Sequence, residues 1–160
     1  MLKVRVICVG KLKERFYTDA VREYEKRLGA FCDLELTELA EERLSKNPSE
    51  AEIAAALRKE AADVERVLPK DGRPVCLCIE GGQMSSEEFA GLLSKAEMSG
   101  SPRLCFVIGS SYGLDEDLKK RADLRLSMSK MTFPHHLARV MLLEQLYRGF
   151  MIREGTKYHK

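Results

Sequence analysis

The chain has 160 residues, of which 44% are hydrophobic and 32% are charged. This length and composition favour one domain with a packed core, and they exclude a disordered tail, a collagen-like chain and a coiled-coil rod. With 27 basic and 25 acidic side chains, the formal net charge is only +2. Any affinity for nucleic acid must therefore come from a local surface.

The basic side chains gather at the C-terminal end of the sequence. Residues 125–160 contain seven basic and two acidic side chains and all three histidines, whereas the first 124 residues are mildly acidic. Any such local affinity for nucleic acid is expected in this last segment. No apolar run approaches the roughly 20 residues that a membrane-spanning helix needs, and the N-terminal residues lack a signal-peptide pattern. This predicts a soluble cytoplasmic protein without a membrane partner.

Five cysteines are present, an odd number, and four of them lie inside apolar, strand-like runs. Such cysteines behave as small core hydrophobes, and their use indicates a reducing compartment. Cys76 and Cys78 form a C-x-C pair, which is a poor metal signal because no second pair of ligands accompanies it. We therefore expect packing cysteines and no metal.

The first half of the chain alternates between strand and helix periods. Strand-like apolar runs are separated by segments whose apolar residues recur at steps of three and four. Ser49 and Glu52 form a capping box at the start of the second helix, and the sequence PKDGRP ends that helix. The predicted elements are a strand over 2–9, a helix over 15–28, a strand over 32–39 and a helix over 49–68.

The second half continues the alternation with shorter elements. Two of its strands are nearly continuous apolar runs, which is typical of buried parallel strands. Ser85 and Glu88 form a second capping box, Asp115 opens a short helix, and Pro134 stands where a helix starts well. The predicted elements are strands over 75–82, 103–109 and 124–128, and helices from Ser85, from Asp115 and over 135–152.

This order predicts a single α/β domain, in which a mostly parallel sheet of five to six strands carries helices on both faces. In such sheets, ligands bind beyond the C-terminal ends of the strands. The segments at those ends are Glu80–Ser86, Gly109–Gly113 and Ser127–Pro134.

Two of these segments are candidate binding elements. The glycines of Gly109–Gly113 let the backbone approach a ligand closely. The turn matches neither a Walker A loop nor G-x-G-x-x-G, and a tight strand-to-helix connection has the same composition. Residues 127–136 place two methionines and a phenylalanine in a polar loop, which suits a flat or soft ligand. A loop that closes the core is the alternative.

Basic and imidazole side chains follow these segments. Arg139 lies one helical turn after His135 or His136, so this face is suited to phosphate, with a solvated helix face as the alternative. The tail resembles a small phosphate-and-stacking grip on RNA, with a frayed terminus as the alternative. Its side chains of interest are Lys157, Tyr158, His159 and Lys160.

Four longer stretches carry a resemblance to a known family. They are VGKLKERFYTDAVREYEKRL, LCIEGGQMSSEEFA, FVIGSSYGL and LSMSKMTFPHHLARVMLLEQLYRGFMIREGTKYHK. Over essentially its whole length, with the same motif order and the same Tyr-His-Lys ending, the chain resembles the RlmH (YbeA) family of the SPOUT superfamily. Members of that family are S-adenosylmethionine-dependent methyltransferases that modify N3 of a pseudouridine in bacterial 23S ribosomal RNA.

The resemblance implies one SPOUT domain over residues 1–160, with a trefoil knot and the S-adenosylmethionine site in about residues 75–160. It also implies a homodimer that acts on ribosomal RNA within the large subunit or the 70S ribosome. The implied cofactor contacts are Leu77, Gly109, Met128, Ser129, Lys130, Met131, Thr132 and Phe133.

In the family, the active site lies at the subunit interface, where the last helix packs against the partner. The catalytic candidates in this sequence are Arg139, to stabilise a developing imidate or hold a phosphate, His159, as a base, and Tyr158. An apolar helix face suits the interface, although a helix buried within the subunit has the same pattern. That face comprises Leu137, Val140, Met141, Leu143, Tyr147 and Phe150.

One departure from the family pattern and two alternative functions accompany this resemblance. The family usually has I-G-G where this chain has Ile108-Gly109-Ser110, and serine keeps the turn if its φ is negative. A noncatalytic ribosome- or RNA-binding module would lack affinity for S-adenosylmethionine. A different nucleotide-using enzyme would bind ATP or NAD at the Gly109 turn.

Overall fold

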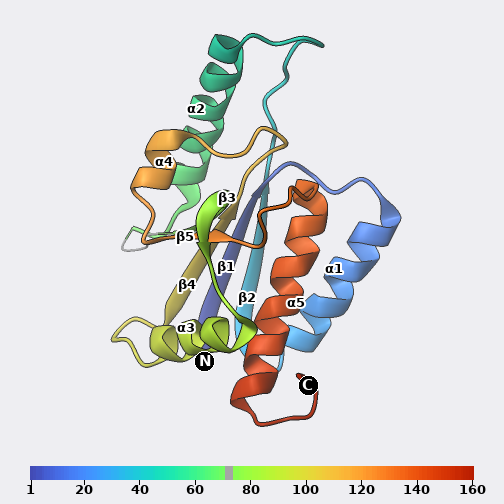
Figure 1. Ribbon diagram of the computed structural model, residues 1–160, viewed down its shortest axis with the longest axis vertical. Coiled ribbons are helices and arrows are strands. Elements are labelled where there is room, and N and C mark those ends of the chain that lie inside the picture. The colour runs from blue at the N-terminus through green and yellow to red at the C-terminus, as the bar shows by residue number, and fades with distance from the viewer. Residues whose placement is uncertain (71–73) are drawn as a thin grey trace.

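The computed structural model describes residues 1–70 and 74–160 (Figure 1). Strands and helices alternate as predicted, with bounds that differ by about one residue. Residues 71–73 of the predicted helix break PKDGRP lie outside the described residues. In chain order the elements are β1 (Leu2–Val9), α1 (Arg15–Leu28), β2 (Cys32–Leu39), α2 (Glu50–Val67), β3 (Val75–Gln83), α3 (Ser86–Glu97), β4 (Arg103–Ile108), α4 (Glu116–Lys120), β5 (Leu124–Ser127) and α5 (His135–Arg153).

The strands form one sheet in the order β2-β1-β4-β3-β5, and every pair of neighbours is parallel. The predicted parallel sheet is confirmed, with five strands in the part of the chain that the structure describes. Parallel neighbours need a crossover connection, and a helix lies between each strand and the next along the chain. As a result, the C-terminal ends of β3, β4 and β5 meet at one edge.

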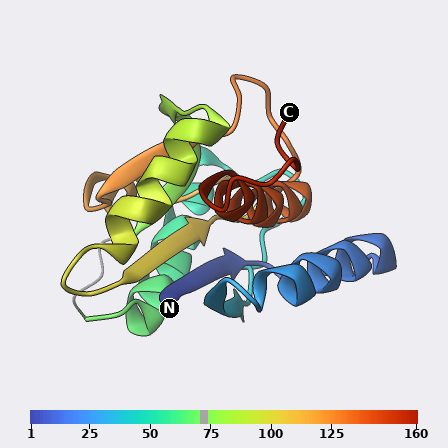
Figure 2. The ribbon, with the colours of Figure 1, turned by 90° about the horizontal axis from the view of Figure 1, so that it is seen from below.

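Helices cover both faces of the sheet, as the alternating apolar residues of the strands predict. Leu2, Val4 and Val6 of β1 belong to a core shared with α1, α3 and α5, whereas Ile7 and Val9 belong to a second core with α2 and α4. Figure 2 shows α3 and α5 on one side of the strands and α2 on the other. The domain therefore has three layers with a core on each side of the sheet.

Both predicted capping boxes are present. The amide of Glu88 donates a hydrogen bond to the Ser85 hydroxyl, and the amide of Ser85 donates one to the Glu88 carboxylate, each at 3.0 Å. Ser49 and Glu52 make the same reciprocal pair at the start of α2. The Ser85 box matters for the site, because it starts α3 directly after β3, at the edge where the strand ends meet.

The cysteines pack in the core as predicted. Cys8, Cys32, Cys76 and Cys105 are buried and Cys78 is half-buried, and all five thiols are free. Burial raises the pKa of Cys76 to about 12 and that of the other three buried thiols to about 11, so they stay protonated and unreactive. Within the described residues, no group of three or more His, Cys, Asp or Glu side chains is placed to hold a metal ion.

Helix α5, with 19 residues, is the longest element and packs against both α1 and α3 (Figure 1). Its position corrects part of the predicted partner face, because Leu143 and Phe150 lie in the core of the subunit itself. The other members of that face are only partly buried, namely Leu137, Val140, Met141 and Tyr147. No helix in residues 1–70 and 74–160 is long and apolar enough to cross a membrane.

Gly149 sets the distance between α5 and α3. A Cβ added there would lie 2.7 Å from Cδ1 of Leu93, and Leu93 is fully buried. We expect Gly149→Val to lower the free energy of unfolding by roughly 1–3 kcal/mol, the usual cost of overpacking a core, as measured by urea denaturation.

The matched control is Gly91→Val on α3, because a Cβ at Gly91 meets nothing within 4 Å. This variant should stay within about 0.5 kcal/mol of the parent. Equal losses in the two variants would contradict the close packing of α5 on α3.

Candidate functional site

The C-terminal ends of β3, β4 and β5 border a cavity of about 280 Å³. This volume is close to the lower end of the range of roughly 300–1,000 Å³ that is typical of small-molecule sites. Its walls come from all three segments that the strand-end rule singled out. The first turn of α5 completes the wall with His135 and Ala138.

Seven of the eight predicted cofactor contacts line this cavity, whereas the exposed side chain of Lys130 does not. The loop before α5 therefore borders an open cavity, which favours a binding role for it over a role in closing the core. Contact with a cofactor stays a prediction for all eight. The seven lining residues are Leu77, Gly109, Met128, Ser129, Met131, Thr132 and Phe133.

The turn after β4 is held by its own backbone. The amide of Gly113 donates to the carbonyl of Ser110 at 2.8 Å, and Gly113 has a φ of +90°, a conformation that favours glycine. A Cβ on Gly109 would collide with the carbonyl of Gly113, so a side chain there would disrupt the turn itself. Ser110 has no positive φ, so serine is tolerated at this position without backbone strain.

β3 departs from regular pairing beside the cavity. Its register with β5 shifts between Leu77 and Gly82. A Cβ on Gly81 would lie 2.7 Å from the carbonyl carbon of Arg125, so this approach of the two strands needs glycine. Residues 78–80, which lie within the shift, border the cavity. Gly81 therefore has a definite structural role, whereas a Cβ on Gly82 would make only an ordinary contact, 3.9 Å from the carbonyl oxygen of Arg125.

Lys119 is a wall residue that the sequence did not reveal. Its side chain comes from α4, is 8% exposed, and contacts the carboxylates of Glu80 and, at 2.8 Å, Glu116. Burial alone would lower the pKa of Lys119, but the hydrogen bonds to Glu116 and Glu80 raise it overall. The cavity is therefore bordered by a fixed positive charge with two acidic partners.

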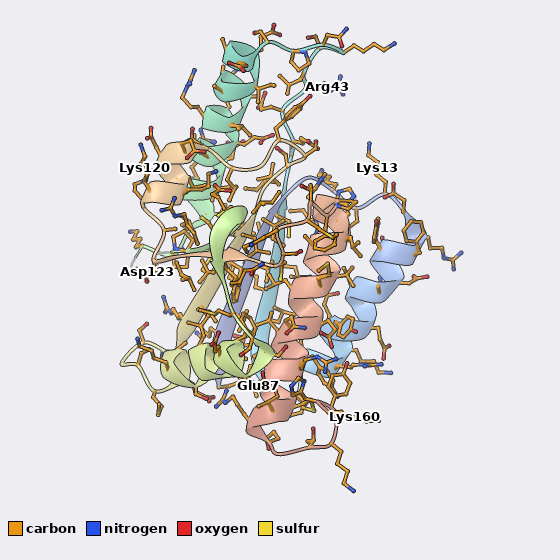
Figure 3. All side chains as sticks on the ribbon, viewed as in Figure 1. Lys13, Arg43, Glu87, Lys120, Asp123 and Lys160 are labelled. Carbon is orange, nitrogen blue, oxygen red and sulfur yellow. The ribbon has the colours of Figure 1, made fainter. Side chains whose placement is uncertain are left out.

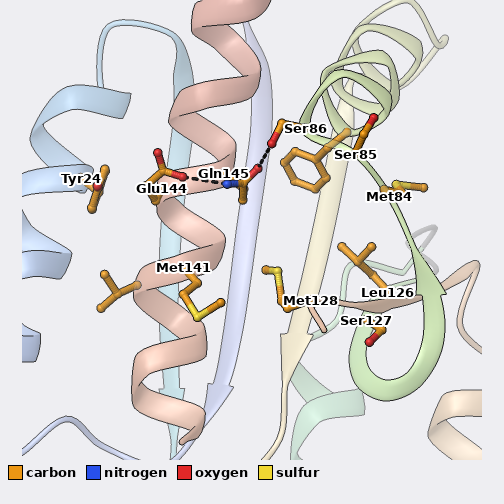
Figure 4. A pocket seen from close by; sticks show the side chains of 12 residues that line it. Tyr24, Met84, Ser85, Ser86, Leu126, Ser127, Met128, Met141, Glu144 and Gln145 are labelled. Atoms are coloured by element: carbon orange, nitrogen blue, oxygen red, sulfur yellow. Dashed lines mark hydrogen bonds between the residues drawn. The ribbon is translucent and has the colours of Figure 1, made fainter. Parts of the chain in front are cut away.

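A second cavity, of about 400 Å³, shares Leu126 and Met128 with the first (Figure 4). Its apolar lining includes Met84 from the loop after β3 and Met141 from α5. A polar edge is formed by Gln145, which accepts a hydrogen bond from Ser86 at 2.7 Å and donates one to Glu144 at 2.8 Å. This cavity lies between the start of α3 and the outer face of α5.

The C-terminal tail is docked on α5, so the alternative of a frayed terminus does not hold. The ring of Tyr158 packs edge-on against Tyr147 with centroids 4.9 Å apart, and the Arg148 guanidinium lies 4.8 Å from its centre. The Tyr158 hydroxyl donates to Glu144 at 3.1 Å. Burial and then the Glu144 charge raise the pKa of Tyr158, so this hydroxyl is a neutral donor.

His159 uses both ring nitrogens. Nδ1 lies 3.1 Å from a guanidinium nitrogen of Arg148, and Nε2 lies 2.7 Å from the carboxylate of Glu87 on α3. Guanidinium groups only donate, so Nδ1 accepts and Nε2 carries the hydrogen, an assignment that follows from the partners.

Figure 3 shows Glu87 and Lys160 at one end of the molecule and Lys13 and Arg43 at the other.

Arg139, one of the three catalytic candidates, is buried. The residue is only 2% exposed. Its guanidinium donates hydrogen bonds to the carboxylate of Glu38 at 2.6 Å and to the carbonyl of Gly10 at 3.0 Å. Burial would raise the pKa of Glu38, but hydrogen bonds from Arg139 and from the Leu12 amide lower it overall. Arg139 therefore joins α5 to the ends of β1 and β2, which favours a structural role.

One subunit does not bring the three catalytic candidates together. Arg139 lies in the first turns of α5, at the cavity end, whereas Tyr158 and His159 both contact Arg148. Arg148 follows Arg139 by nine positions along the helix, which corresponds to about 13 Å along the axis. The cavity and the tail are thus at different ends of the same rigid helix.

Comparison with known proteins agrees with this architecture. A family model described as "Predicted SPOUT methyltransferase" matches residues 2–159. A protein of Streptococcus equi subsp. zooepidemicus named "Ribosomal RNA large subunit methyltransferase H" is 44% identical over 159 residues, which is 99% of this chain and 100% of that protein. A protein of Clostridium beijerinckii with the same name is 42% identical over the same shares. The chain belongs to the SPOUT methyltransferase family.

Solved structures resemble this SPOUT methyltransferase in fold. A probable methylase family protein from Haemophilus influenzae Rd KW20 has a TM-score of 0.52 at 13% identity, covering 99% of this chain and 69% of its own. A protein of Legionella pneumophila, described as a methyltransferase in complex with the bound cofactor SAM, has a TM-score of 0.51 at 15% identity. That match covers 91% of this chain and 65% of the Legionella chain.

The Arg139–Glu38 pair generates a stability prediction. Arg139→Ala leaves Glu38 without its main partner, and we expect the free energy of unfolding to fall by about 2–4 kcal/mol, somewhat less than for a fully buried pair because Glu38 is partly open to solvent. The difference between parent and variant should shrink as the pH falls through the lowered pKa of Glu38, since protonation removes the charge that Arg139 pairs with.

Urea denaturation at pH 7 and in acid measures both effects. Arg15→Ala serves as the control, because the Arg15–Asp19 pair is exposed and should contribute under about 0.5 kcal/mol. A loss for Arg139→Ala no larger than for Arg15→Ala would show that the buried pair does not stabilise the fold.

Proposed function

We propose that this SPOUT methyltransferase transfers a methyl group from S-adenosylmethionine to N3 of a pseudouridine in 23S ribosomal RNA, within the large subunit or the 70S ribosome. Relatives at 42–44% identity, matched over their full length, are named for methylation of large-subunit ribosomal RNA. We further propose one domain over residues 1–160, a trefoil knot in about residues 75–160 and a cytoplasmic location, where ribosomes are found.

The observation that carries the proposal is the meeting of three distant segments at one cavity. Leu77, Met128 and Phe133 offer it soft apolar surface, and the turn 109–113 offers it exposed backbone. A flat purine and a thioether chain are recognised by such a mixture of apolar side chains and backbone groups. The residues present therefore fit S-adenosylmethionine, and they would hold it at the C-terminal strand ends.

The chemistry asks little of the protein beyond orientation and proton transfer. S-adenosylmethionine supplies a methyl group on a sulfonium, which is already a strong electrophile. The protein must align the imide nitrogen of the target base and remove its proton. We propose His159 as the proton acceptor. Arg148 must then release Nδ1, while Glu87 keeps its contact with the Nε2 hydrogen and stabilises the imidazolium that forms.

Tyr158 orients this group rather than exchanging a proton. Its hydroxyl is bonded to Glu144, and Glu144 also holds Arg148 at 2.7 Å. The ring of Tyr158 and the guanidinium of Arg148 thus form one unit beside His159. We propose that this unit and the basic residues of the tail grip the RNA around the target base.

The distance along α5 supports a homodimer as the active unit. Arg139 and Arg148 are about 13 Å apart along the helix axis, so we propose that a base held at the cavity meets the tail of a second subunit rather than His159 of its own. A second subunit that docks against the outer face of α5 would bring its own tail to the cavity. The second cavity, with Met84, Met128 and Met141 in its lining, supplies the apolar surface for such docking (Figure 4).

Methylation of defined particles tests the function. Purified protein with radiolabelled S-adenosylmethionine should transfer one methyl group to ribosomes from cells that lack this enzyme, and nucleoside mass spectrometry should identify it as N3-methylpseudouridine. Particles whose target pseudouridine has been left as uridine are the matched control and should accept far less. A methyl group at another atom, or equal transfer to both particles, would contradict the proposal.

Calorimetry separates the alternatives. We expect binding of S-adenosylmethionine and no binding of ATP or NAD. A protein that binds ribosomes but none of the three small molecules would be a noncatalytic module, and binding of ATP or NAD instead would indicate a different nucleotide-using enzyme.

The dimer is tested by a charge placed on the proposed interface. Met141→Glu should shift the sedimentation mass from about twice 18.1 kDa to the monomer, and it should remove methyl transfer while S-adenosylmethionine still binds. Met98→Glu is the matched control, because Met98 is 82% exposed and lies at the far end of α3. A monomeric parent with full activity would overturn the dimer.

A further inference from the structure

A buried carboxylate connects helix α2 to the turn beside the cavity. The Ser110 hydroxyl donates to Oε1 of Glu60 at 2.8 Å, and the amide of Glu42 donates to Oε2 of the same side chain at 2.9 Å. Glu60 and Ser110 are only 5% and 6% exposed. Each oxygen of the Glu60 carboxylate therefore accepts one hydrogen bond, Oε1 from the turn after β4 and Oε2 from the segment that follows β2.

A second contact runs beside the first, at the surface. The hydroxyl of Ser111 donates to Oε1 of Glu41 at 2.8 Å. Residues 41–42 and 110–111 are thus joined at two neighbouring points. Neither pair belongs to one of the ten named helices and strands, so hydrogen bonds of this kind, rather than sheet or helix pairing, hold the two segments together.

The turn that Glu60 holds has little freedom to move without changing the cavity. Gly109 has no room for a side chain, Gly113 needs a positive φ, and the backbone between them borders the cavity. A displacement of Ser110 would therefore move the cavity wall. The family's usual I-G-G pattern offers no hydroxyl at this position, so the Ser110–Glu60 bond depends on the serine of this chain.

The surroundings of Glu60 make its two donors necessary. Burial is the largest influence that raises its pKa, and the Glu41 and Glu42 charges add to it, while the hydrogen bonds from the Glu42 amide and Ser110 oppose them. A buried carboxylate without hydrogen bonds is strongly destabilising. Ser110 and Glu60 therefore depend on each other: the hydroxyl stabilises the carboxylate, and the carboxylate fixes the turn.

We propose that Glu60 is a positioning residue of the cofactor site, which acts through Ser110 to hold the turn 109–113 in the shape that receives S-adenosylmethionine. The identity of the ligand rests on the proposed function, whereas the control of the turn rests on the contacts of Glu60 itself. Glu60 touches neither cofactor nor RNA in this assignment.

Hydrogen exchange in the absence of any ligand tests the control of the turn. Glu60→Met removes both acceptors at similar volume, and Ser110→Ala removes one hydroxyl. Each should speed exchange of the 111–113 amides by about tenfold, the effect of losing one hydrogen bond to a charged group, while the amides of α1 are unchanged. Glu60→Gln should restore slow exchange, because its amide oxygen accepts from Glu42 and its NH₂ group donates to Ser110.

Calorimetry with S-adenosylmethionine tests the consequence for binding. Glu60→Met and Ser110→Ala should each weaken binding by about tenfold, and the double variant should bind no more weakly than either single one, since both remove the same link. Glu60→Gln and Glu50→Gln, the latter an exposed glutamate on the same helix, should stay within about threefold of the parent. In methyl transfer, KM for the cofactor should rise while kcat at saturation is kept.

The two proposals fail in different ways. A parent that binds no S-adenosylmethionine would overturn the proposed function, and the exchange measurement would still decide the role of Glu60. Parent-like exchange and binding in both Ser110→Ala and Glu60→Met would overturn the positioning role. If Glu60→Met does not fold, Ser110→Ala alone decides the outcome.

Discussion

Burial of α5 against α1, α3 and the sheet is the constraint on which the rest of the site depends. The first turn of the helix borders the cavity at the strand ends through His135 and Ala138. Its later turns carry Glu144 and Arg148, which hold the tail. Because an α-helix rises 1.5 Å per residue and this one is fixed in the core, the separation of cavity and tail is fixed with it.

The residues at both ends of α5 are held by several contacts, which keeps this separation constant. At the cavity end, Arg139 is buried and bonded to the ends of β1 and β2. At the other end, Tyr158 and His159 are held by ring contacts and hydrogen bonds to α5 and α3. Arg139, Tyr158 and His159 are therefore each held in place at their own end of the helix. We propose that a second copy brings its tail to the cavity and docks at the second cavity beside Met141.

The sequence predicted the features that depend on local pattern. Strand and helix periods gave the order of elements, and the rule for parallel sheets singled out the three segments that border the cavity. The family resemblance supplied eight candidate cofactor contacts, and seven of them line this cavity. Where local pattern and family agreed, the structure places the residues together.

The features that the sequence did not predict depend on tertiary pairing. Lys119 meets Glu80 only because α4 folds over the end of β3, and Ser110 meets Glu60 only because α2 covers that face of the sheet. Helical periodicity predicts that a charged residue such as Arg139 faces solvent. Its guanidinium is buried because it donates hydrogen bonds to Glu38 and to the carbonyl of Gly10, which lie near the ends of β2 and β1. The polar composition of the tail likewise gave no sign that Tyr158 packs on Tyr147.

Complementation between two defective subunits tests most directly whether the cavity of one subunit works with the tail of the other. Thr132→Trp would fill the cavity and His159→Ala would remove the proposed base, so each homodimer should be inactive. A purified mixed dimer of the two chains contains one site in which an intact cavity meets an intact tail, and it should recover about half of the parental methyl transfer. A mixed dimer as inactive as both homodimers would show that cavity and tail act within one subunit, and would contradict this account.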